Sequence, residues 1–381
     1  MISNTKFVCK FYAAFYNYNM TQNVYIHIPF CRRKCKYCSF VSFDKIEQKN
    51  LYLNSLGEEI ISNYQNEPLK TLYIGGGTPS LLDIKDFSRI ISNFNTDKNT
   101  EITTELNPEN LTYQYLKELF FLGINRISLG CQTFDDDILK IIGRQHTSKQ
   151  VKNVVKDAQM AGFENISLDF IYGLPTQTPD GFIKDLKEAV NLGIQHISLY
   201  GLKVEEGCYF YKHYPDNLPD DEIQAQMYLK AIEILKQSGF EHYEISNFSK
   251  KGFHSKHNLN YWNNNSYYGF GVAAHGYLDG IRYSDYLTID EYIKNSNKRK
   301  EEHRLSQQEK LEEEIFLGFR KMSGINVPEI NNRYNIDFET KYKKILEKYT
   351  SSGHIEKSKD NYKLSVKGIL VSNYILADFL E

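Results

Sequence analysis

The stretch that decides the fold runs from Tyr25 to Cys38 and reads YIHIPFCRRKCKYC. Its first half is apolar and β-branched, as expected of a strand that packs in a core. Its second half places three cysteines close together, at positions 31, 35 and 38. A loop that directly follows a strand can bring three such thiols to one centre. Soft thiolate ligands favour zinc, Cu(I) or an iron–sulfur cluster.

The number of cysteines distinguishes between these metals. A [4Fe–4S] cube ordinarily takes four cysteines, one for each iron, so Cys31, Cys35 and Cys38 would leave one iron free for another ligand. The alternative is a zinc site formed by these cysteines and His27. Three basic residues at positions 32–34 would favour thiolates and offset the charge of a cluster. We therefore predict a [4Fe–4S] cluster on the three cysteines.

Composition excludes several classes of function. The chain has 381 residues, of which 41% are hydrophobic and 25% charged, as in an ordinary globular protein. Its formal net charge of −2 does not favour a nucleic-acid partner. No stretch reaches the roughly 20 apolar residues of a membrane span. Six cysteines, three clustered and three scattered, make a poor disulfide framework, and we expect a cytoplasmic protein.

Short β-branched or apolar runs recur along the first 200 residues, with amphipathic segments between most of them. Strands that alternate with helices in this way predict parallel βα units. Six units are two fewer than a complete eight-fold barrel. The predicted fold class is therefore α/β, a partial (β/α)6 barrel, and a doubly wound sheet is the alternative. The runs are 24–28, 71–74, 101–105, 126–129, 166–171 and 196–200.

The pattern changes after about residue 240. We predict a core barrel over residues 20–240, a connecting region over 241–300 and a small, mostly helical C-terminal domain over 301–381. Ser306 and Glu309 have the spacing of a capping box at the start of a helix in that domain. The favoured start of translation is Met20, just before the first strand, which would leave residues 1–19 as an untranslated N-terminal extension.

Further polar residues follow the later strands. The glycines of GGGTP, residues 75–79, would let backbone N–H groups approach a ligand, although a tight turn alone would also explain them. Glu105 ends the third predicted strand, Gln132 follows the fourth, Arg144 lies twelve residues further on, and Asp169 lies within the fifth. Each would project near the carboxyl ends of the strands, where barrel enzymes assemble their sites. Arg144 can pair with a carboxylate, and the acidic residues can accept hydrogen bonds from hydroxyls or an amine. Taken singly, each could be an ordinary loop residue.

The CxxxCxxC spacing after a strand resembles the radical S-adenosylmethionine (SAM) superfamily. The resemblance implies that SAM occupies the open iron through its amino and carboxylate groups. It also implies that the reduced cluster passes an electron to the sulfonium of SAM. The SAM-binding residues that the resemblance implies are Tyr25, Tyr37, Gly76, Gly77, Thr78, Glu105, Gln132, Arg144 and Asp169.

A narrower resemblance extends over nearly the whole chain. The stretches YIHIPFC, GGGTP, ELNPE, RISLGCQTF, DFIYGLP and SLYGLKVEEG are similar to the oxygen-independent coproporphyrinogen III oxidase family. Within it, the chain looks most like the HemW-type heme chaperone subgroup. Dehydrogenases of the family carry another cysteine two residues after the third cluster cysteine, where this chain has Phe40. They also have a longer segment before the residue that corresponds to Tyr25.

A six-residue motif supports that subgroup. Residues 257–262 read HNLNYW and match the HNxxYW motif of heme chaperones. The resemblance implies heme, with His257 as the axial ligand and with Tyr261 and Trp262 against the porphyrin or its propionates. The nearby His254 and His275 are alternative ligands. It is also possible to explain His257 as a residue that only hydrogen-bonds within a folded connection.

The predicted function is therefore that of a heme chaperone, which binds heme and transfers it to an acceptor protein. The family leads us to expect a respiratory or membrane-associated acceptor, and a regulatory use of cluster and SAM. The alternative is an oxygen-independent coproporphyrinogen III dehydrogenase, which oxidatively decarboxylates propionates. A third reading is a radical SAM enzyme with an unrelated substrate. Whether the protein is a catalyst stays open at this point.

Overall fold

The computed structural model of the protein describes residues 21–109 and 111–380. The predicted extension, residues 1–19, and the favoured start at Met20 lie outside the described residues. No helix in the described part of the chain is long and apolar enough to cross a membrane.

The first 200 residues alternate strands and helices. All six predicted strand runs form strands, each extended by one to three residues. In chain order the elements are β1 (Asn23–Ile28), η1 (Ile46–Gln48), α2 (Lys49–Asn63), β2 (Thr71–Gly76), η2 (Pro79–Leu81), α3 (Ile84–Ile91), β3 (Glu101–Leu106), α4 (Tyr113–Phe121), β4 (Arg126–Gln132), α5 (Asp136–Ile141), α6 (Ser148–Ala161), β5 (Ile166–Tyr172), α7 (Pro179–Asn191) and β6 (His196–Gly201).

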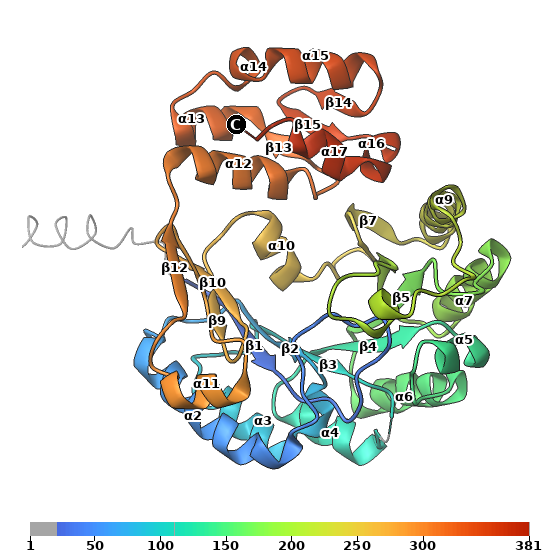
Figure 1. Ribbon diagram of the computed structural model, residues 1–381, viewed down its shortest axis with the longest axis vertical. Coiled ribbons are helices and arrows are strands. Elements are labelled where there is room, and N and C mark those ends of the chain that lie inside the picture. Colours follow the sequence, from blue (N-terminus) through green and yellow to red (C-terminus); the bar gives the residue numbers. More distant parts are fainter. Residues whose placement is uncertain (1–20, 110, 381) are drawn as a thin grey trace, which may run out of the picture.

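The sheet order confirms the partial barrel. Strands β1 to β6 are parallel and lie in sequential order within a sheet ordered β7-β8-β6-β5-β4-β3-β2-β1-β9. A doubly wound sheet would reverse its strand order at a switch point, and this sheet does not. Figure 1 shows an open, curved sheet with helices α2 to α7 along its outer side. The carboxyl ends of the six parallel strands therefore all lie along the same edge of the curved sheet.

Local sequence explains where the covering helices begin and what they bury. Asp83 caps α3 and Thr147 caps α6, each in a capping box that satisfies free N–H groups. The strands are apolar on the side that these helices cover, and Val24, Ile26 and Ile28 of β1 are fully buried. The main core therefore lies between the sheet and its outer helices.

The chain after β6 adds strands to both edges of the sheet. β7 and β8 form an antiparallel hairpin beside β6, and β9 pairs in parallel with β1. A separate antiparallel sheet has the order β10-β11-β12. The elements are α8 (Tyr209–Lys212), α9 (Asp221–Gln237), β7 (Glu241–Glu244), β8 (Asn247–Ser249), α10 (Lys256–Trp262), β9 (Tyr268–Phe270), β10 (His275–Leu278), β11 (Ile281–Ser284), α11 (Ile289–Asn295) and β12 (Glu301–Arg304).

The C-terminal part has a second hydrophobic core. That core includes the buried side chains of Ile315, Phe319, Phe338 and Phe379. Its first helix begins with the predicted capping box of Ser306. The elements are α12 (Gln307–Gly318), β13 (Ile325–Asn326), α13 (Val327–Tyr334), α14 (Phe338–Lys341), α15 (Lys343–Ser351), β14 (Ile355–Ser358), β15 (Asn361–Leu364), α16 (Val366–Leu370) and α17 (Ser372–Ala377).

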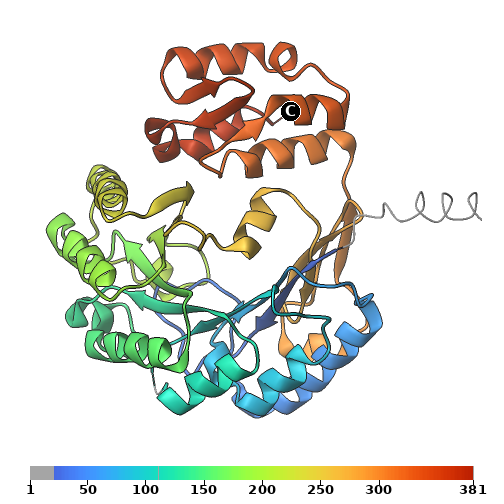
Figure 2. The same ribbon diagram turned by 180° about the vertical axis from the view of Figure 1, so that it is seen from behind.

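The C-terminal part is mostly helical, but it also contains a small sheet of order β13-β15-β14 that the sequence pattern did not predict. These strands have two to four residues each, too few for period-two alternation to stand out. Figures 1 and 2 show this part across the open side of the curved sheet, with α10 between the two. The helix that carries the HNxxYW motif thus lies at the junction.

Candidate functional site

Backbone hydrogen bonds hold the cysteine loop at its base and in its middle. The backbone N–H of Cys31 donates to the carbonyl of Phe43 at 2.9 Å, which closes the loop at its base. The N–H of Lys36 donates to the carbonyl of Ile142 at 3.0 Å, and its carbonyl accepts from the N–H of Phe210 at 3.0 Å. Because the segments after β4 and β6 hold the loop, its position at the carboxyl ends of the strands is defined.

The three thiols of this loop are half-buried and form no disulfide. The Cys31 sulfur lies 3.3 Å from the hydroxyl of Thr78, and the Cys35 sulfur accepts from Arg144 at 3.6 Å. Burial, together with the charges of the other two thiols, raises the pKa of Cys38 to about 11. Three thiolates in this setting need a positive centre to ionise, which a metal cluster supplies. The donor set therefore fits an iron–sulfur cluster.

His27 does not join the thiols. Its Nδ1 lies 3.0 Å from the Tyr25 hydroxyl and its Nε2 2.9 Å from the carbonyl of Val41. Burial lowers the pKa of His27, so the ring is neutral. Among residues 21–109 and 111–380, no three His, Cys, Asp or Glu side chains are arranged to hold a single metal ion. A zinc site with His27 would require one of these two ring nitrogens to give up its hydrogen bond.

The glycine run lies directly against the cysteine loop. A Cβ on Gly77 would lie 2.7 Å from the carbonyl oxygen of Phe30 and 3.1 Å from the Cys31 sulfur. Gly76 has a φ of +113°, and a Cβ there would lie 2.7 Å from the ring of His27. Side chains are therefore excluded here by close packing as well as by backbone conformation. The run brings backbone without side chains next to the predicted cluster ligands.

Glu105 connects the glycine run to the next strands. Its carboxylate accepts from the Tyr73 hydroxyl at 2.7 Å and from the N–H of Gly76 at 3.0 Å. Burial raises the pKa of Glu105 to about 7. Tyr25, opposite Tyr73 in the register of β1 and β2, stacks on it with ring centroids 6.0 Å apart. Glu105 can therefore accept a hydrogen bond from an amine beside the glycine run.

Arg144 lies on the other side of the loop. It donates to Cys35, and its Nη2 donates to the carbonyl of Gly130 and to the side-chain oxygen of Asn107, each at 2.9 Å. Gln132, at the bulge of β4, has a φ of +63°, and its buried side-chain oxygen has no hydrogen-bond partner. A buried polar atom without a partner is rare and is satisfied when a ligand supplies a donor.

Asp169 lies one strand further along. In the register of the sheet it is opposite Gly130, the residue that Arg144 contacts. Its carboxylate accepts from Ser128 at 2.9 Å and from Ser167 at 3.3 Å, and burial raises its pKa. Asp169 therefore faces the same interior as Gln132 but does not touch the cysteine loop.

The structure thus gathers most of the predicted site. Direct contacts link Cys31 to Thr78, Cys35 to Arg144, and Gly76 to Glu105. Tyr37 is half-buried beside the cysteines and Arg144, and burial raises its pKa. Sequence reasoning did not assign Tyr73 or Asn107. Asn107 lies within ELNPE, one of the stretches that resemble the family, whereas nothing in the local pattern marks Tyr73.

The HNxxYW helix lies inside the barrel. Ser255 caps α10, and the carboxylate of Glu101 accepts from the N–H of Lys256 and of His257 at 3.2 and 3.1 Å. The aromatic ring of Tyr73 stacks on His257, with centroids 5.0 Å apart. The helix is therefore fixed to β2 and β3, close to the residues around Glu105.

Both ring nitrogens of His257 are engaged. Nδ1 lies 2.8 Å from the hydroxyl of Thr71, and Nε2 lies 2.8 Å from the hydroxyl of Tyr261. His257 is 1% exposed, and burial lowers its pKa to about 3. The ring is thus neutral, as an axial ligand must be, but in this conformation it hydrogen-bonds within the fold. Ligation of iron by His257 stays a prediction.

The other residues predicted near heme have different environments. Trp262 is half-buried at the end of α10. His254 pairs with Glu241 at 3.0 Å, and its ring stacks on Tyr243. His275, in β10, is exposed to solvent. His257 of the motif is therefore buried, whereas His254 and His275, on either side of it in the sequence, are more exposed.

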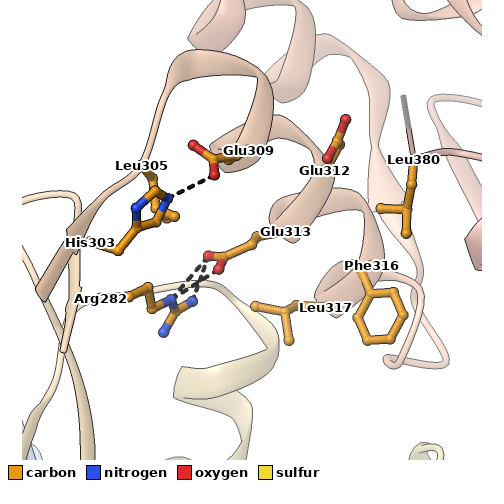
Figure 3. Close-up of a pocket in the computed structure, with 9 residues that line it drawn as sticks. All are labelled: Arg282, His303, Leu305, Glu309, Glu312, Glu313, Phe316, Leu317 and Leu380. Carbon is orange, nitrogen blue, oxygen red and sulfur yellow. Dashed lines mark hydrogen bonds and ion pairs between the residues drawn. The ribbon is translucent and has the colours of Figure 1, made fainter. Parts of the chain in front are cut away.

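A cavity of about 470 Å³ lies between the β10-β11-β12 sheet and α12 (Figure 3). Within it Arg282 forms a two-pronged ion pair with Glu313 at 2.7–3.1 Å, and His303 pairs with Glu309 at 2.7 Å. None of the residues predicted from sequence to bind a cofactor lines it. Its walls combine apolar, basic and acidic side chains, namely Arg282, His303, Leu305, Glu309, Glu312, Glu313, Phe316, Leu317 and Leu380.

Two family models match the chain. The radical SAM superfamily matches residues 25–189, which hold the cysteine loop and the first five strands. The HemN C-terminal domain matches residues 305–371, which hold most of the second core.

Several relatives match at full length. "Heme chaperone HemW" of Lactococcus lactis is 38% identical over 368 residues, 94% of this chain and 97% of the relative. "Heme chaperone HemW" of Bacillus subtilis is 36% identical over 375 residues, 94% of this chain and 99% of the relative.

One solved structure shares the whole architecture. Coproporphyrinogen III oxidase (HemN) of Escherichia coli superimposes with a TM-score of 0.85 over 97% of this chain and 92% of that one, at 20% identity. At that identity the match shows the shared fold. With the two full-length relatives and the matching family models, it follows that the chain belongs to the HemW family of radical SAM proteins.

Proposed function

We propose that this protein is a heme chaperone, which binds heme and passes it to an acceptor protein. The observation that carries the proposal is the similarity to HemW heme chaperones of two bacteria, which extends over 94% of the chain. Phe40, at the position where dehydrogenases of the family have a further cysteine, also favours a chaperone over a dehydrogenase. The family leads us to propose a respiratory or membrane-associated acceptor.

The proposal assigns residues of the cysteine loop to the cluster and residues around it to SAM. Cys31, Cys35 and Cys38 hold a [4Fe–4S] cluster, whose open iron takes exchangeable SAM. When bound and reduced, the cluster supplies an electron to the sulfonium of SAM. Glu105 accepts from the SAM amine beside Gly76, and the guanidinium of Arg144 pairs with the SAM carboxylate.

The remaining polar residues complete the SAM site. The side-chain oxygen of Gln132, which lacks a partner in the described structure, accepts a hydrogen bond from the ligand. Asp169 accepts from the ribose hydroxyls. Tyr25 orients His27, and Tyr37 packs beside the cysteines, so both position the loop.

Heme binding in this proposal uses the HNxxYW helix. His257 is already neutral, but its Nε2 is engaged with the Tyr261 hydroxyl. Iron ligation therefore requires Nε2 to exchange Tyr261 for iron while Nδ1 keeps Thr71, a partner that holds the ring orientation. The lost hydrogen bond costs about 1 kcal/mol, little beside an iron–nitrogen bond. Tyr261 and Trp262 then lie against the porphyrin.

A heme titration of the wild type and three variants tests this assignment. We expect wild-type protein to bind one heme per chain and His257→Ala to bind heme at least tenfold more weakly, with an unchanged iron–sulfur absorbance. His254→Ala and His275→Ala are matched controls, because they remove the outer histidines of the same region. Equal heme affinity in His257→Ala and wild type would remove the motif from the heme site. Loss of affinity in a control instead would move the ligand to that residue.

A further inference from the structure

We propose that Arg126, the first residue of β4, binds a propionate carboxylate of heme inside the barrel. Heme is then held at two points, with its iron on His257 and one carboxylate on Arg126. The inference rests on the proposed heme function. It adds a residue that belongs neither to the HNxxYW motif nor to the predicted SAM site.

Arg126 is a buried cation without a partner. Its side chain is 2% exposed, and its buried Nε has no hydrogen-bond partner in the described structure. The side chain forms no ion pair or hydrogen bond with any other residue of the described chain. By contrast, the buried guanidinium of Arg144 donates to Cys35, Asn107 and Gly130. Because a buried polar group without a partner is rare, the donors of Arg126 indicate an acceptor from outside the chain.

A second group without a partner lies opposite Arg126. Thr103 of β3 pairs with Arg126 in the register of the parallel strands, so both side chains project from the same face of the sheet. Glu101 and Glu105, two residues to either side of Thr103, share this inner face. The hydroxyl of Thr103 is fully buried and also has no partner in the described structure. Two adjacent donors fit one carboxylate, which accepts several hydrogen bonds at once and pairs well with arginine.

The carboxylates of the protein near Arg126 are bonded to other groups. Glu101 accepts from the N–H of His257 at 3.1 Å, and Asp169 accepts from the hydroxyl of Ser128 at 2.9 Å. Burial by itself lowers the pKa of Arg126, but the charge of Glu101 and of other neighbours raises it, and the net shift is upward. The guanidinium is therefore charged, while its hydrogen-bond donors stay available.

The position of Arg126 suits a ligand whose iron is on His257. Glu101 contacts the backbone of His257 and lies two residues before Thr103, which corresponds to about 7 Å along β3. The propionates of heme extend from one edge of the porphyrin, away from the iron. Two-point binding therefore requires a carboxylate site near the histidine but not on it, as Arg126 provides.

The same register separates Arg126 from the SAM site. Glu105, which contacts the glycine run, is opposite Ser128, two residues further along β4 than Arg126. A carboxylate on Arg126 therefore lies nearer the amino ends of the strands than SAM does. Because Arg126 is buried, heme reaches it only when α10 shifts; this short helix lies between the sheet and the C-terminal part (Figures 1 and 2).

A comparison of heme with heme dimethyl ester tests the inference. Esterification removes the charge of the propionates but keeps the porphyrin and its iron. We take the ratio of the dissociation constant of the ester to that of heme, and expect this ratio to be at least tenfold smaller in Arg126→Gln than in wild type. A merely structural role of Arg126 would weaken both ligands alike and leave the ratio unchanged.

Arg320→Gln is the matched control for this comparison. The buried Nε of Arg320 also lacks a partner in the described structure, but its side chain donates to Asn373 in the C-terminal part. The substitution removes the same charge and the same kind of buried atom. We expect the ratio in this variant to stay within about twofold of the wild-type value.

Two further variants keep the test decisive if Arg126→Gln does not fold. Arg126→Lys keeps the charge but loses the two-pronged geometry, so the ratio should fall by about threefold. Thr103→Val removes a hydroxyl that has no partner in the described structure, so urea unfolding of the ligand-free protein should be unchanged. The ratio in Thr103→Val should fall by about twofold to threefold.

The possible results separate this inference from the proposed function. Failure of the wild type to bind heme would contradict the heme function itself. Normal heme binding with equal ratios in wild type, Arg126→Gln and Arg126→Lys would overturn only the role of Arg126. If acetate raises the melting temperature of ligand-free wild type but not of Arg126→Gln, and the ratios are equal, the site takes a free small carboxylate and its assignment to heme is wrong.

Discussion

The imidazole of His257 stacks on the phenol ring of Tyr73, and the hydroxyl of that phenol donates to Glu105. Glu105 in turn accepts from the backbone of Gly76. One tyrosine of β2 therefore touches both the histidine of the HNxxYW motif and the carboxylate beside the glycine run. The two regions that we assign to heme and to SAM are neighbours through Tyr73.

Removal of the Tyr73 hydroxyl should affect SAM more than heme. Tyr73→Phe keeps the ring on His257 but takes one donor from Glu105. The lost hydrogen bond orients Glu105 and contributes about 1 kcal/mol, so its removal corresponds to roughly fivefold weaker SAM binding. Equilibrium dialysis with labelled SAM measures this, and heme affinity should change less than twofold. Tyr115→Phe, which removes a hydroxyl bonded to Leu82 elsewhere, is the control. Equal SAM affinity in both variants would contradict the role of Tyr73.

Each cysteine of the loop should be necessary for the cluster. Cys31→Ala, Cys35→Ala and Cys38→Ala each leave a second iron without a thiolate, and we expect iron and sulfide to fall well below about four of each per chain. Cys208→Ala, which replaces a buried cysteine outside the loop, should retain them. Anaerobic metal analysis of the reconstituted variants decides. Full retention by any loop variant would count against this ligand set.

Tyr261 should compete with heme for His257. Tyr261→Phe frees Nε2 of His257 while it keeps the ring packing against Tyr267. We expect the heme dissociation constant to be equal to that of wild type or lower, by up to about fivefold, because a hydrogen bond no longer opposes ligation. Absorbance titration with heme measures the affinity. Marked weakening in Tyr261→Phe would show instead that this hydroxyl holds the heme or that His257 is not the ligand.

A buried pair of carboxyls should make the stability of the fold depend on pH. Burial raises the pKa of Asp285 to about 7 and raises that of Glu59 well above its usual value. Glu59 also accepts from Tyr292 and from the N–H of Gly271, so the pair joins α2 to the segments around β9 and α11. Because the native state binds these protons more tightly, the contribution of this pair to the free energy of unfolding is complete below about pH 4 and is lost as pH rises through 7.

Asp285→Asn tests this dependence. Between about pH 5.5 and 8 the wild type should lose roughly 2 kcal/mol more unfolding free energy than the variant. Urea unfolding at the two pH values gives the difference. Asp290→Asn is the control, since Asp290 is exposed and its pKa is lowered by Lys45. Parallel pH dependence in Asp285→Asn and wild type would contradict the raised pKa of Asp285.

The sequence predicted the barrel because each strand is long and flanked by glycine or helix caps. It did not predict β9, where Tyr268 to Phe270 pair with β1 from more than 240 residues away. Such a short strand has no readable alternation, and its pairing depends on the finished β1 edge. The hairpin of β7 and β8 escaped prediction for the same reason.

Site residues that lie close together in the sequence could be predicted, whereas those that only the tertiary structure brings together could not. Three cysteines in one loop indicate a metal whatever the fold around them. The neighbours of His257 could not be read in this way, since Thr71 and Tyr73 come from β2, far away in the chain. The pair of Glu59 and Asp285 is likewise created by packing alone. Spacing can identify metal ligands within one loop, but the hydrogen-bond and stacking partners of a side chain are known only from the fold.

The most direct question about this protein is whether it acts as a heme chaperone or as a dehydrogenase. One reconstituted sample should be divided, with heme titrated into one half and coproporphyrinogen III, SAM and a reductant added anaerobically to the other. We predict one heme bound per chain and no protoporphyrinogen IX. Accumulation of protoporphyrinogen IX over repeated turnovers, or a sample that binds no heme, would contradict the assignment.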